Sequence, residues 1–331
     1  MRQAATIRDV ARAASLSVAS VSRVLNGHEN VHADTRTRVL DAVRALGYTP
    51  NAAARSLSTA RTHAIGVVLP DLHGEFFSEL VRGMDRAASA AGYLLLLSNM
   101  HADPVLAKQA LAAMRGRVDG LIVMAPQLAP EELAETLPVA LPALLVNCPD
   151  DPRHPALRID NRAGMRTMVR HLLGLGRRRI VHFAGVPGNL DGDERRAAFT
   201  EAMAEFAPDL PARILDGDFS DASGETLARA LLAERGELDA VLAANDMMAL
   251  GALFALREAG VDVPRQVAVT GFDDVPLSRW LGLTTIRVDM VGIGERAVTR
   301  LVAAMAGADD CAVERLVPEL VQRATTAQTA G

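Results

Sequence analysis

Cysteine and aromatic residues are scarce in this 331-residue chain, which contains two cysteines and 3% Phe, Trp and Tyr. So few cysteines in a long chain are typical of a reduced intracellular protein, not of a disulfide-stabilised secreted one. Long hydrophobic runs are also missing, because no stretch approaches the roughly 18 apolar residues that span a membrane. Met1-Arg2-Gln3 leads into polar sequence without the apolar core of a signal peptide. We therefore expect a cytoplasmic protein with no membrane contact.

Charge is unevenly divided along the chain, whose net charge is −5. Residues 1–61 have nine arginines and four acidic residues, a net charge of +5, so the remaining residues carry −10. A basic N-terminal segment joined to an acidic body favours a nucleic-acid-binding head. A solvated charged face on an ordinary helical domain is the alternative. The chain is long enough for two or three units with separate cores.

Three short helices are expected in the basic segment. Thr6-Ile7-Arg8-Asp9 has the form of a capping box, and Val10, Ala13 and Ala14 share one face of the helix that follows. Ser17 is a good N-cap for a second helix over residues 18–25, which Asn26-Gly27 would end.

The turn at Ser15-Leu16 is short, so these two helices form a helix-turn-helix. A third helix, from about Asp34 to Leu46, would close a small shared core. The expected core residues are Val10, Leu16, Val21, Val24, Val39, Val43 and Leu46.

The second helix has small side chains on its predicted outer face. Val21, Val24 and Leu25 point inward, which leaves Val18, Ala19, Ser22 and Arg23 outward. Such a face can approach the major groove closely, where Val and Ala contact thymine methyl groups and Arg binds guanine. A three-helix structural domain with an inert surface is the alternative.

Two further features of the N-terminal segment need an interpretation. Pro50 ends the third helix, and Asn51 can cap a short helix that runs through Leu57. A helix this short is unstable alone and would fold only when a binding partner orders it. An ordinary interdomain linker is the alternative. His28-Glu29-Asn30-Val31-His32 matches the zinc-protease signature but follows a helix stop. We therefore expect neither a metal nor any other cofactor.

From Ala64 onward, apolar strand-like runs alternate with amphipathic helices. Such alternation predicts parallel sheets covered on both faces by helices, and two successive series indicate two similar subdomains. The expected strands are AIGVVLP, YLLLLSN, GLIVMAP, ALLVN, IVHFAG, ARILDGDF, AVLAAN and VAVTGFD.

Polar residues follow many of these strands, at the edge where such sheets bind ligands. With nearby aromatic residues for stacking, they would suit a polyhydroxylated ligand, although each could instead be a turn former or a helix cap. The polar positions are Asp71, Asn99, Asn147, Asp160-Asn161, Asn245-Asp246 and Asp273-Asp274, and the aromatic ones are Phe76, Phe77, Phe219 and Trp280.

An enzymatic role is not expected. Asp273-Asp274, or Asp191, Asp193 and Glu194, could be glycosidase carboxylates, but nothing in the sequence fixes a pair across a scissile bond. Neither a phosphate-binding P-loop nor a G-x-S-x-G elbow is present.

Several longer motifs follow one another along the chain. TIRDVARAASLSVASVSRVLNG is followed by GYTPNAAARSL, and then by IGVVLPD with FFSELVRGMDRAASAAGY. IDNRAG, HLLGLGRRRI, AANDMMALGAL, VAVTGFDD and LTTIRVDM come later. In this order they resemble the LacI/GalR family of bacterial transcription regulators over nearly the whole chain.

The resemblance implies an all-α helix-turn-helix N-terminal domain plus a hinge helix. An α/β periplasmic-binding-protein-like core of two Rossmann-like subdomains follows. The implied boundaries are residues 1–49 for the DNA-binding domain, 50–61 for the hinge and 62–331 for the core. Within the core, the N-subdomain comprises about 62–161 and 290–320, and the C-subdomain 162–289 and 321–331.

The resemblance also implies a homodimer that binds a near-palindromic operator in double-stranded DNA. Val18, Ala19 and Arg23 match base-reading positions, and Leu57 matches a hinge leucine that wedges into the minor groove. The other implied DNA contacts are Thr6, Ser17, Ser20, Ser22, Asn26, Asn51 and Ala54.

A small-molecule effector, a sugar or sugar derivative, is implied between the two core subdomains. Phe76, Phe77, Arg195, Phe219 and Asp273 match effector-contacting positions. Asp71, Asn147, Asn161, Asn245 and Trp280 are further candidates.

Some positions depart from the family pattern. Ser15 replaces a turn glycine, His32 a capping serine, Arg177 a histidine, and Gly282 a proline near Trp280. No C-terminal heptad repeat follows, so a tetramer is not expected.

The sequence thus predicts an effector-controlled regulator, most simply a repressor, of carbohydrate-utilisation genes. A stand-alone sugar-binding protein or a sugar-active enzyme is the alternative.

Overall fold

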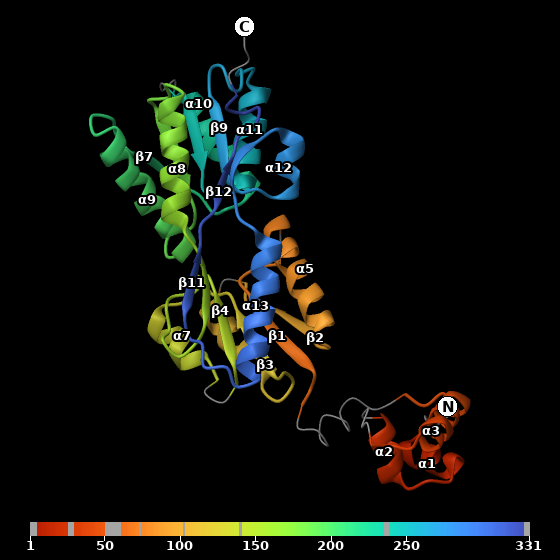
Figure 1. The fold of residues 1–331 in the computed structure, drawn as a ribbon. Coiled ribbons are helices and arrows are strands. Elements are labelled where there is room, and N and C mark those ends of the chain that lie inside the picture. Colours follow the sequence, from red (N-terminus) through yellow and green to blue (C-terminus); the bar gives the residue numbers. More distant parts are fainter. Residues whose placement is uncertain are drawn as a thin grey trace. The chain divides into compact units, whose positions relative to one another are not determined.

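The computed structural model divides by its internal contacts into two units, Met1–His63 and Ala64–Gly331 (Figure 1). It describes residues 5–25, 30–49, 61–72, 74–101, 103–138, 141–234 and 238–327. Each unit has a hydrophobic core of its own. No helix in these described ranges is both long and apolar enough to cross a membrane.

The first unit contains helices α1 (Ile7–Ala14), α2 (Val18–Leu25) and α3 (Ala33–Leu46). The capping box is formed: the Thr6 hydroxyl accepts from the Asp9 N–H, and the Asp9 carboxylate accepts from the Thr6 N–H at 3.0 Å. Ser15 takes the left-handed conformation (φ 52°) at the end of α1, so the chain turns at once into α2. The turn between the helices is therefore as short as the sequence predicts.

The core of the first unit contains most of the expected residues but not all of them. Val10, Val21, Val24 and Val39 are buried as predicted, and Leu16 and Val43 pack against them partly buried. Leu46 was expected in this core, but it is 40% exposed because it lies in the last turn of α3.

A second correction concerns α1. Ala13 is exposed, and Ala11 is buried beside Ala14 in its place. The inward stripe of α1 is thus rotated by roughly 50° from the predicted one, since successive residues are 100° apart around a helix.

The second unit contains two six-stranded sheets, each with helices on both faces (Figure 1). The first sheet has the order β11-β5-β4-β3-β1-β2, and all its pairs are parallel. Its strands are β1 (Ala64–Leu69), β2 (Leu94–Asn99), β3 (Gly120–Val123), β4 (Ala143–Val146), β5 (Ala156–Ile159) and β11 (Val313–Leu316). Its helices are α5 (Glu75–Ala90), α6 (Pro104–Met114), α7 (Pro130–Thr136) and α13 (Met290–Met305). These elements form the first lobe.

The second sheet has the order β12-β10-β9-β8-β6-β7, and only its β10–β12 pair is antiparallel. Its strands are β6 (Ile180–Ala184), β7 (Arg213–Asp216), β8 (Ala240–Ala243), β9 (Ala268–Asp273), β10 (Thr284–Arg287) and β12 (Glu319–Val321). Its helices are α8 (Asn161–Gly174), α9 (Leu190–Phe206), α10 (Asp221–Ala233), α11 (Asp246–Glu258) and α12 (Pro276–Leu281). These elements form the second lobe.

The chain passes between the lobes at residues 159–161, 287–290 and 316–319. The eight predicted strands are all present, but β5, β10, β11 and β12 did not stand out as apolar runs. Each of them carries charged or threonine side chains, as in ALRI and TTIR. The carboxyl ends of the strands face the junction between the lobes, which is where the candidate ligand residues lie.

Helices α5 and α13 pack through glycine in the first lobe. A Cβ atom at Gly83 would lie 2.1 Å from the carbonyl oxygen of Val291, and one at Gly294 would lie 2.3 Å from that of Leu80. Because both obstacles are backbone atoms, neither can rotate away. The two helix backbones therefore touch only because both positions lack a side chain.

This packing predicts that Gly83→Ala lowers the free energy of unfolding by about 2–3 kcal/mol, since the added methyl group overpacks a rigid contact. Gly174→Ala is the control, because it lies at the exposed end of α8 with nothing within 4 Å of the new methyl group. The control should be neutral or slightly stabilising. Thermal and urea unfolding of the two variants measure the difference, and equal stability would contradict the close contact.

Candidate functional site

The outer face of α2 carries the residues predicted to read DNA bases. Val18 is 42% exposed, and Ala19 and Arg23 are also exposed, while Val21 and Val24 are buried beneath them. Two small side chains and one cation therefore stand together on an otherwise packed helix. This is the arrangement that fits a major groove.

The other predicted DNA-contacting residues of this unit divide into three groups. Thr6 and Ser17 are exposed at helix starts, where the Ser17 Oγ lies 2.9 Å from the Ser20 Oγ and accepts from the Ser20 N–H. Ser20 and Ser22 are half-buried. Asn26, Asn51, Ala54 and Leu57 lie outside the described residues, as do His28 and Glu29 of the zinc-like motif.

In the second unit, the structure brings Asn161, Arg195 and Asp273 together. The Arg195 Nε donates to the Asn161 Oδ1 at 2.8 Å, and its Nη2 lies 3.5 Å from the Asp273 Oδ1. All three side chains are buried. The Arg195 guanidinium also donates to the Ala244 carbonyl and lies over the Phe272 ring, 3.8 Å from its centroid.

The network continues through residues that the sequence analysis did not assign to the site. The Asn161 Nδ2 donates to Asp191 and to Glu194, at 2.8 Å in each case. Glu194 also pairs with Arg158, which lies in β5 of the first lobe. Arg158 could have been noticed as a single charge in the apolar run ALRI, and Glu194 as one of the carboxylates considered for catalysis.

Burial controls the protonation of the acidic groups here. It raises the pKa of Asp273 to about 8, an effect that Arg195 opposes and that the neighbouring Asp246 and Asp191 reinforce. Burial also raises the pKa of Asp246 to about 7, although the hydroxyls of Ser278 and Thr285 donate to its carboxylate. The Asp273 Oδ1 has no hydrogen-bond partner among the described residues.

Asn147 and Asn245 occupy strand ends on opposite lobes. The Asn147 Oδ1 accepts from the Ile159 N–H, while its buried Nδ2 has no partner in the described part of the chain. Asn245 caps α11 and donates to the carbonyl of Phe219. Phe219 has a φ of 69°, and its ring lies where a side chain at Gly185 would be.

The remaining predicted effector residues lie after β1, at the start of α5 and on α12. Phe76 and Phe77 are half-buried at the start of α5, with their rings 5.2 Å apart. Asp71 is exposed after β1. Trp280 was expected to stack on a ligand, but it is 81% exposed on α12 and contacts Arg279.

Hydrogen bonds join the two lobes on either side of these residues. The Glu75 Oε2 accepts from the Leu277 N–H at 2.9 Å, so a side chain of α5 caps α12 of the other lobe. The Leu190 N–H donates to the Pro126 carbonyl at 2.8 Å. A ligand bound between the lobes would therefore lie beside hydrogen bonds that already cross the junction.

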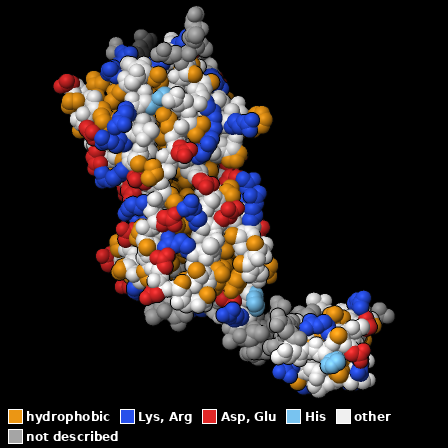
Figure 2. Space-filling model, viewed as in Figure 1, with side chains coloured by type: hydrophobic (Ala, Val, Ile, Leu, Met, Phe, Trp, Pro, Cys, Tyr) orange, Lys and Arg blue, Asp and Glu red, His pale blue; other side chains and the backbone are white. Residues whose placement is uncertain are grey.

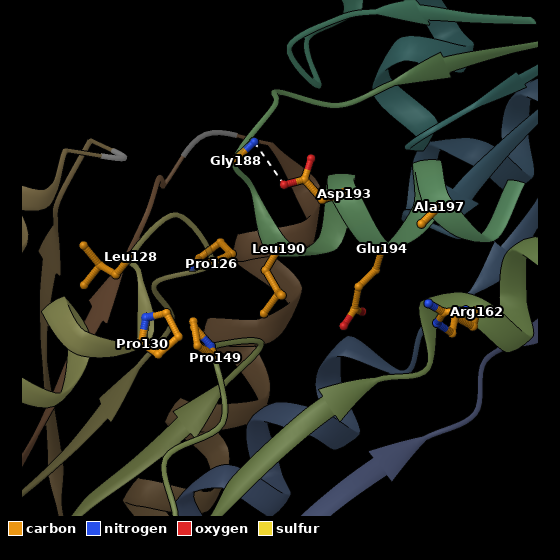
Figure 3. A pocket seen from close by; sticks show the side chains of 10 residues that line it. All are labelled: Pro126, Leu128, Pro130, Pro149, Arg162, Gly188, Leu190, Asp193, Glu194 and Ala197. Carbon is orange, nitrogen blue, oxygen red and sulfur yellow. Dashed lines mark hydrogen bonds between the residues drawn. The ribbon is translucent and has the colours of Figure 1, made fainter. Parts of the chain in front are cut away.

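A cavity of about 430 Å³ opens beside the Leu190–Pro126 contact (Figure 3). None of the ten predicted effector residues, all of which are described, lines it. Its walls are formed by Pro126, Leu128, Pro130, Pro149, Arg162, Gly188, Leu190, Asp193, Glu194 and Ala197.

The carboxylates considered for glycoside hydrolysis are engaged in local structure. Asp274 pairs with Arg287 and Arg323, each at 2.7 Å. Asp193 accepts from the Gly188 N–H, and Glu194 accepts from Asn161. No group of three or more potential ligands within the described ranges could hold a metal ion. This arrangement can bind a polar ligand through a buried donor and a buried acceptor.

Two family descriptions match parts of the chain. Residues 6–51 match "Bacterial regulatory proteins, lacI family", and residues 169–326 match "Periplasmic binding protein-like domain". The chain is also 35% identical over 328 residues to the HTH-type transcriptional regulator GalS of Salmonella typhimurium strain LT2, covering 97% of this chain and 96% of GalS.

Solved structures agree with these matches. The lac repressor dimer bound to operator and the anti-inducer ONPF is similar at a TM-score of 0.90 and 30% identity, covering 98% of this chain and 100% of the repressor chain. A complex of the regulator CelR with cellobiose is similar at a TM-score of 0.70 and 28% identity, covering 97% and 99%. The predicted family resemblance and fold class are confirmed. The chain therefore belongs to the lacI family of bacterial regulatory proteins and is a DNA-binding transcriptional regulator.

Proposed function

We propose that this chain is a cytoplasmic, effector-controlled repressor of carbohydrate-utilisation genes that binds a near-palindromic operator as a homodimer and catalyses no reaction. The observation that carries the proposal is the exposed face of α2 in a basic unit joined to an acidic one. The relatives are regulators and not enzymes, which supports a binding role for the buried carboxylates.

The face of α2 supports sequence-specific DNA binding. Val18 and Ala19 are short enough to let the helix approach base edges and contact thymine methyl groups. Arg23 supplies the donors that guanine accepts. One helix with so few base-reading side chains distinguishes few DNA sequences. A second copy of the chain on the other half of the palindrome would supply the remaining sequence specificity.

An exposed apolar edge supports the homodimer. Strand β2 lies at the edge of the first sheet, and Leu94, Leu96 and Leu97 on it are exposed, Leu94 by 74%. Hydrophobic side chains are visible on this part of the first lobe in Figure 2. A second copy of the chain would cover such an edge, which otherwise promotes aggregation.

The buried network supports a sugar effector. Asn161, Arg195 and Asp273 form the inner group, and Asn147, with its unpartnered Nδ2, lies on the other lobe. Hydroxyl groups can both donate to Asp273 and accept from Asn147, which suits a polyol. The similar regulator CelR is in a complex with cellobiose. We include Asp71, Phe76, Phe77, Phe219, Asn245 and Trp280 as outer candidates.

Binding between the lobes would control DNA binding by changing the lobe arrangement. The Glu75–Leu277 and Leu190–Pro126 hydrogen bonds cross the junction, so a change in the lobe arrangement would break them. A ligand that prefers one arrangement shifts the population toward it. In a dimer, that shift would alter the spacing of the paired residues 50–61, which join each core to its DNA-binding unit.

The DNA interface is tested by Arg23→Ala. We expect base preference to relax at one position per half-site, with a loss of about 1–3 kcal/mol on the preferred base. Arg44→Ala is the charge-matched control, because Arg44 lies on α3 and pairs with Asp41. Selection from a randomised palindromic duplex pool, followed by fluorescence anisotropy, measures both variants. Equal loss on every sequence would make Arg23 a phosphate contact, and no sequence preference in the wild type would overturn DNA regulation.

The effector site is tested by Asp273→Asn in a thermal-shift screen of mono- and disaccharides. The amide keeps the shape but replaces one carboxyl oxygen with an NH2 group that cannot accept a hydrogen bond, so we expect the affinity of a stabilising sugar to fall about tenfold or more. Asp209→Asn, an exposed carboxylate in the loop before β7, is the control and should respond like the wild type. A sugar that stabilises Asp273→Asn fully would show that the site lies elsewhere.

A further inference from the structure

The Glu194 side chain lies where the two lobes meet. It extends from α9 of the second lobe (Figure 3), and its Oε1 accepts from Arg158 in β5 of the first lobe. The Arg158 side chain is 5% exposed and also donates to the Cys148 carbonyl and to Asp150, each at 2.9 Å. Arg158 is therefore fixed by its own lobe and holds one oxygen of the Glu194 carboxylate.

The second oxygen of this carboxylate contacts the second lobe. The Glu194 Oε2 accepts from the Asn161 Nδ2 at 2.8 Å, and the other hydrogen of the same amide goes to the Asp191 Oδ1, also at 2.8 Å. Because both amide hydrogens have a carboxylate acceptor, the Asn161 Oδ1 is left to face Arg195, whose Nε donates to it at 2.8 Å. The two carboxylates thus orient the amide, and the amide orients Arg195.

This arrangement requires a carboxylate at position 194. Each oxygen of Glu194 accepts from a different donor, Arg158 on one side and Asn161 on the other. A glutamine has the same shape but only one acceptor oxygen, and its NH2 group would face the remaining donor. The guanidinium is the charged and therefore stronger donor. The glutamine oxygen would turn toward Arg158, and the Asn161 amide would lose one of its two acceptors.

We propose that Glu194 is a positioning residue of the effector site: it holds the Asn161 amide so that Arg195 faces Asp273, and Arg158 of the first lobe aligns its carboxylate. This inference rests on the proposed sugar site. The Glu194 side chain is 24% exposed and lines the cavity beside Leu190. The experiment must therefore distinguish positioning from direct contact with a ligand.

Calorimetric titration of the full chain with glucose, galactose, ribose and cellobiose tests the proposal. We expect Glu194→Gln to weaken the binding of a sugar that binds the wild type by about fivefold, a moderate loss because Asp191 still accepts the other amide hydrogen. Glu201→Gln is the matched control, since Glu201 is exposed on the same helix and pairs with Arg162. The control should bind the sugar like the wild type.

The Arg158→Met background separates positioning from direct contact. Without the guanidinium, the glutamine oxygen can accept from Asn161, so Glu194→Gln should weaken sugar binding by less than about twofold in Arg158→Met. An equal loss in both backgrounds would show that Glu194 contacts the ligand itself, and it would overturn the positioning role. Urea unfolding measures the folded fraction of each variant, and the affinities refer to that fraction.

Two other outcomes would also overturn the inference. If a sugar binds the wild type and Glu194→Gln equally well, the positioning role alone is wrong and the sugar site stands. If none of the four sugars binds the wild type, the sugar site and the positioning role fall together. Operator binding is measured separately, so neither result bears on DNA regulation.

Discussion

The effector-binding core depends on the pairing of one buried cation, Arg195. An unpaired guanidinium would be too costly to bury, so its contacts fix the elements that supply them. Those contacts reach Asn161 at the start of α8, the Ala244 carbonyl after β8, and Asp273 at the end of β9. Strand ends and helix starts that would otherwise be separate loops thus converge on one point.

The contacts of Arg195 leave Asp273 able to accept a hydrogen bond from a ligand. The Asp273 Oδ1 is buried and faces Arg195 at 3.5 Å without a hydrogen bond from any described residue, and burial raises the pKa of Asp273 to about 8. A hydroxyl group from a ligand would satisfy that oxygen, and the ligand could also reach Asn147 across the junction. In the proposed mechanism, the arrangement of the lobes and the affinity for the ligand would depend on one set of contacts, which would give the effector its control.

Sequence reasoning succeeded where a local rule decides structure. The Thr6–Asp9 capping box and the alternation of apolar runs with helices depend on neighbouring residues, so both could be read directly. Prediction failed where contacts between residues far apart in the sequence determine the structure. Strand β5 contains Arg158, whose partner Glu194 is 36 residues away, and a charge in a short apolar run argues against a strand.

The candidate site was partly predictable for the same reason. Strand-end positions and the family resemblance selected Arg195 and Asp273 as candidates, whereas the cavity beside Leu190 arises from helices and loops of both lobes and leaves no local pattern. Trp280 was selected for its aromatic chemistry alone; its ring is exposed to solvent on α12, and its contact with a ligand stays a prediction. Exposure depends on the packing of α12, which residue type alone does not determine.

The central claim is that one set of lobe contacts links effector binding to DNA binding. Thermodynamic linkage requires that the effector change operator affinity by the same factor by which the operator changes effector affinity. The most direct measurement titrates a stabilising sugar into the protein by calorimetry, with and without a saturating operator duplex, and titrates the operator with and without the sugar. The account predicts two equal factors, about fivefold or more and in the same direction. A sugar affinity that the operator leaves unchanged would contradict it.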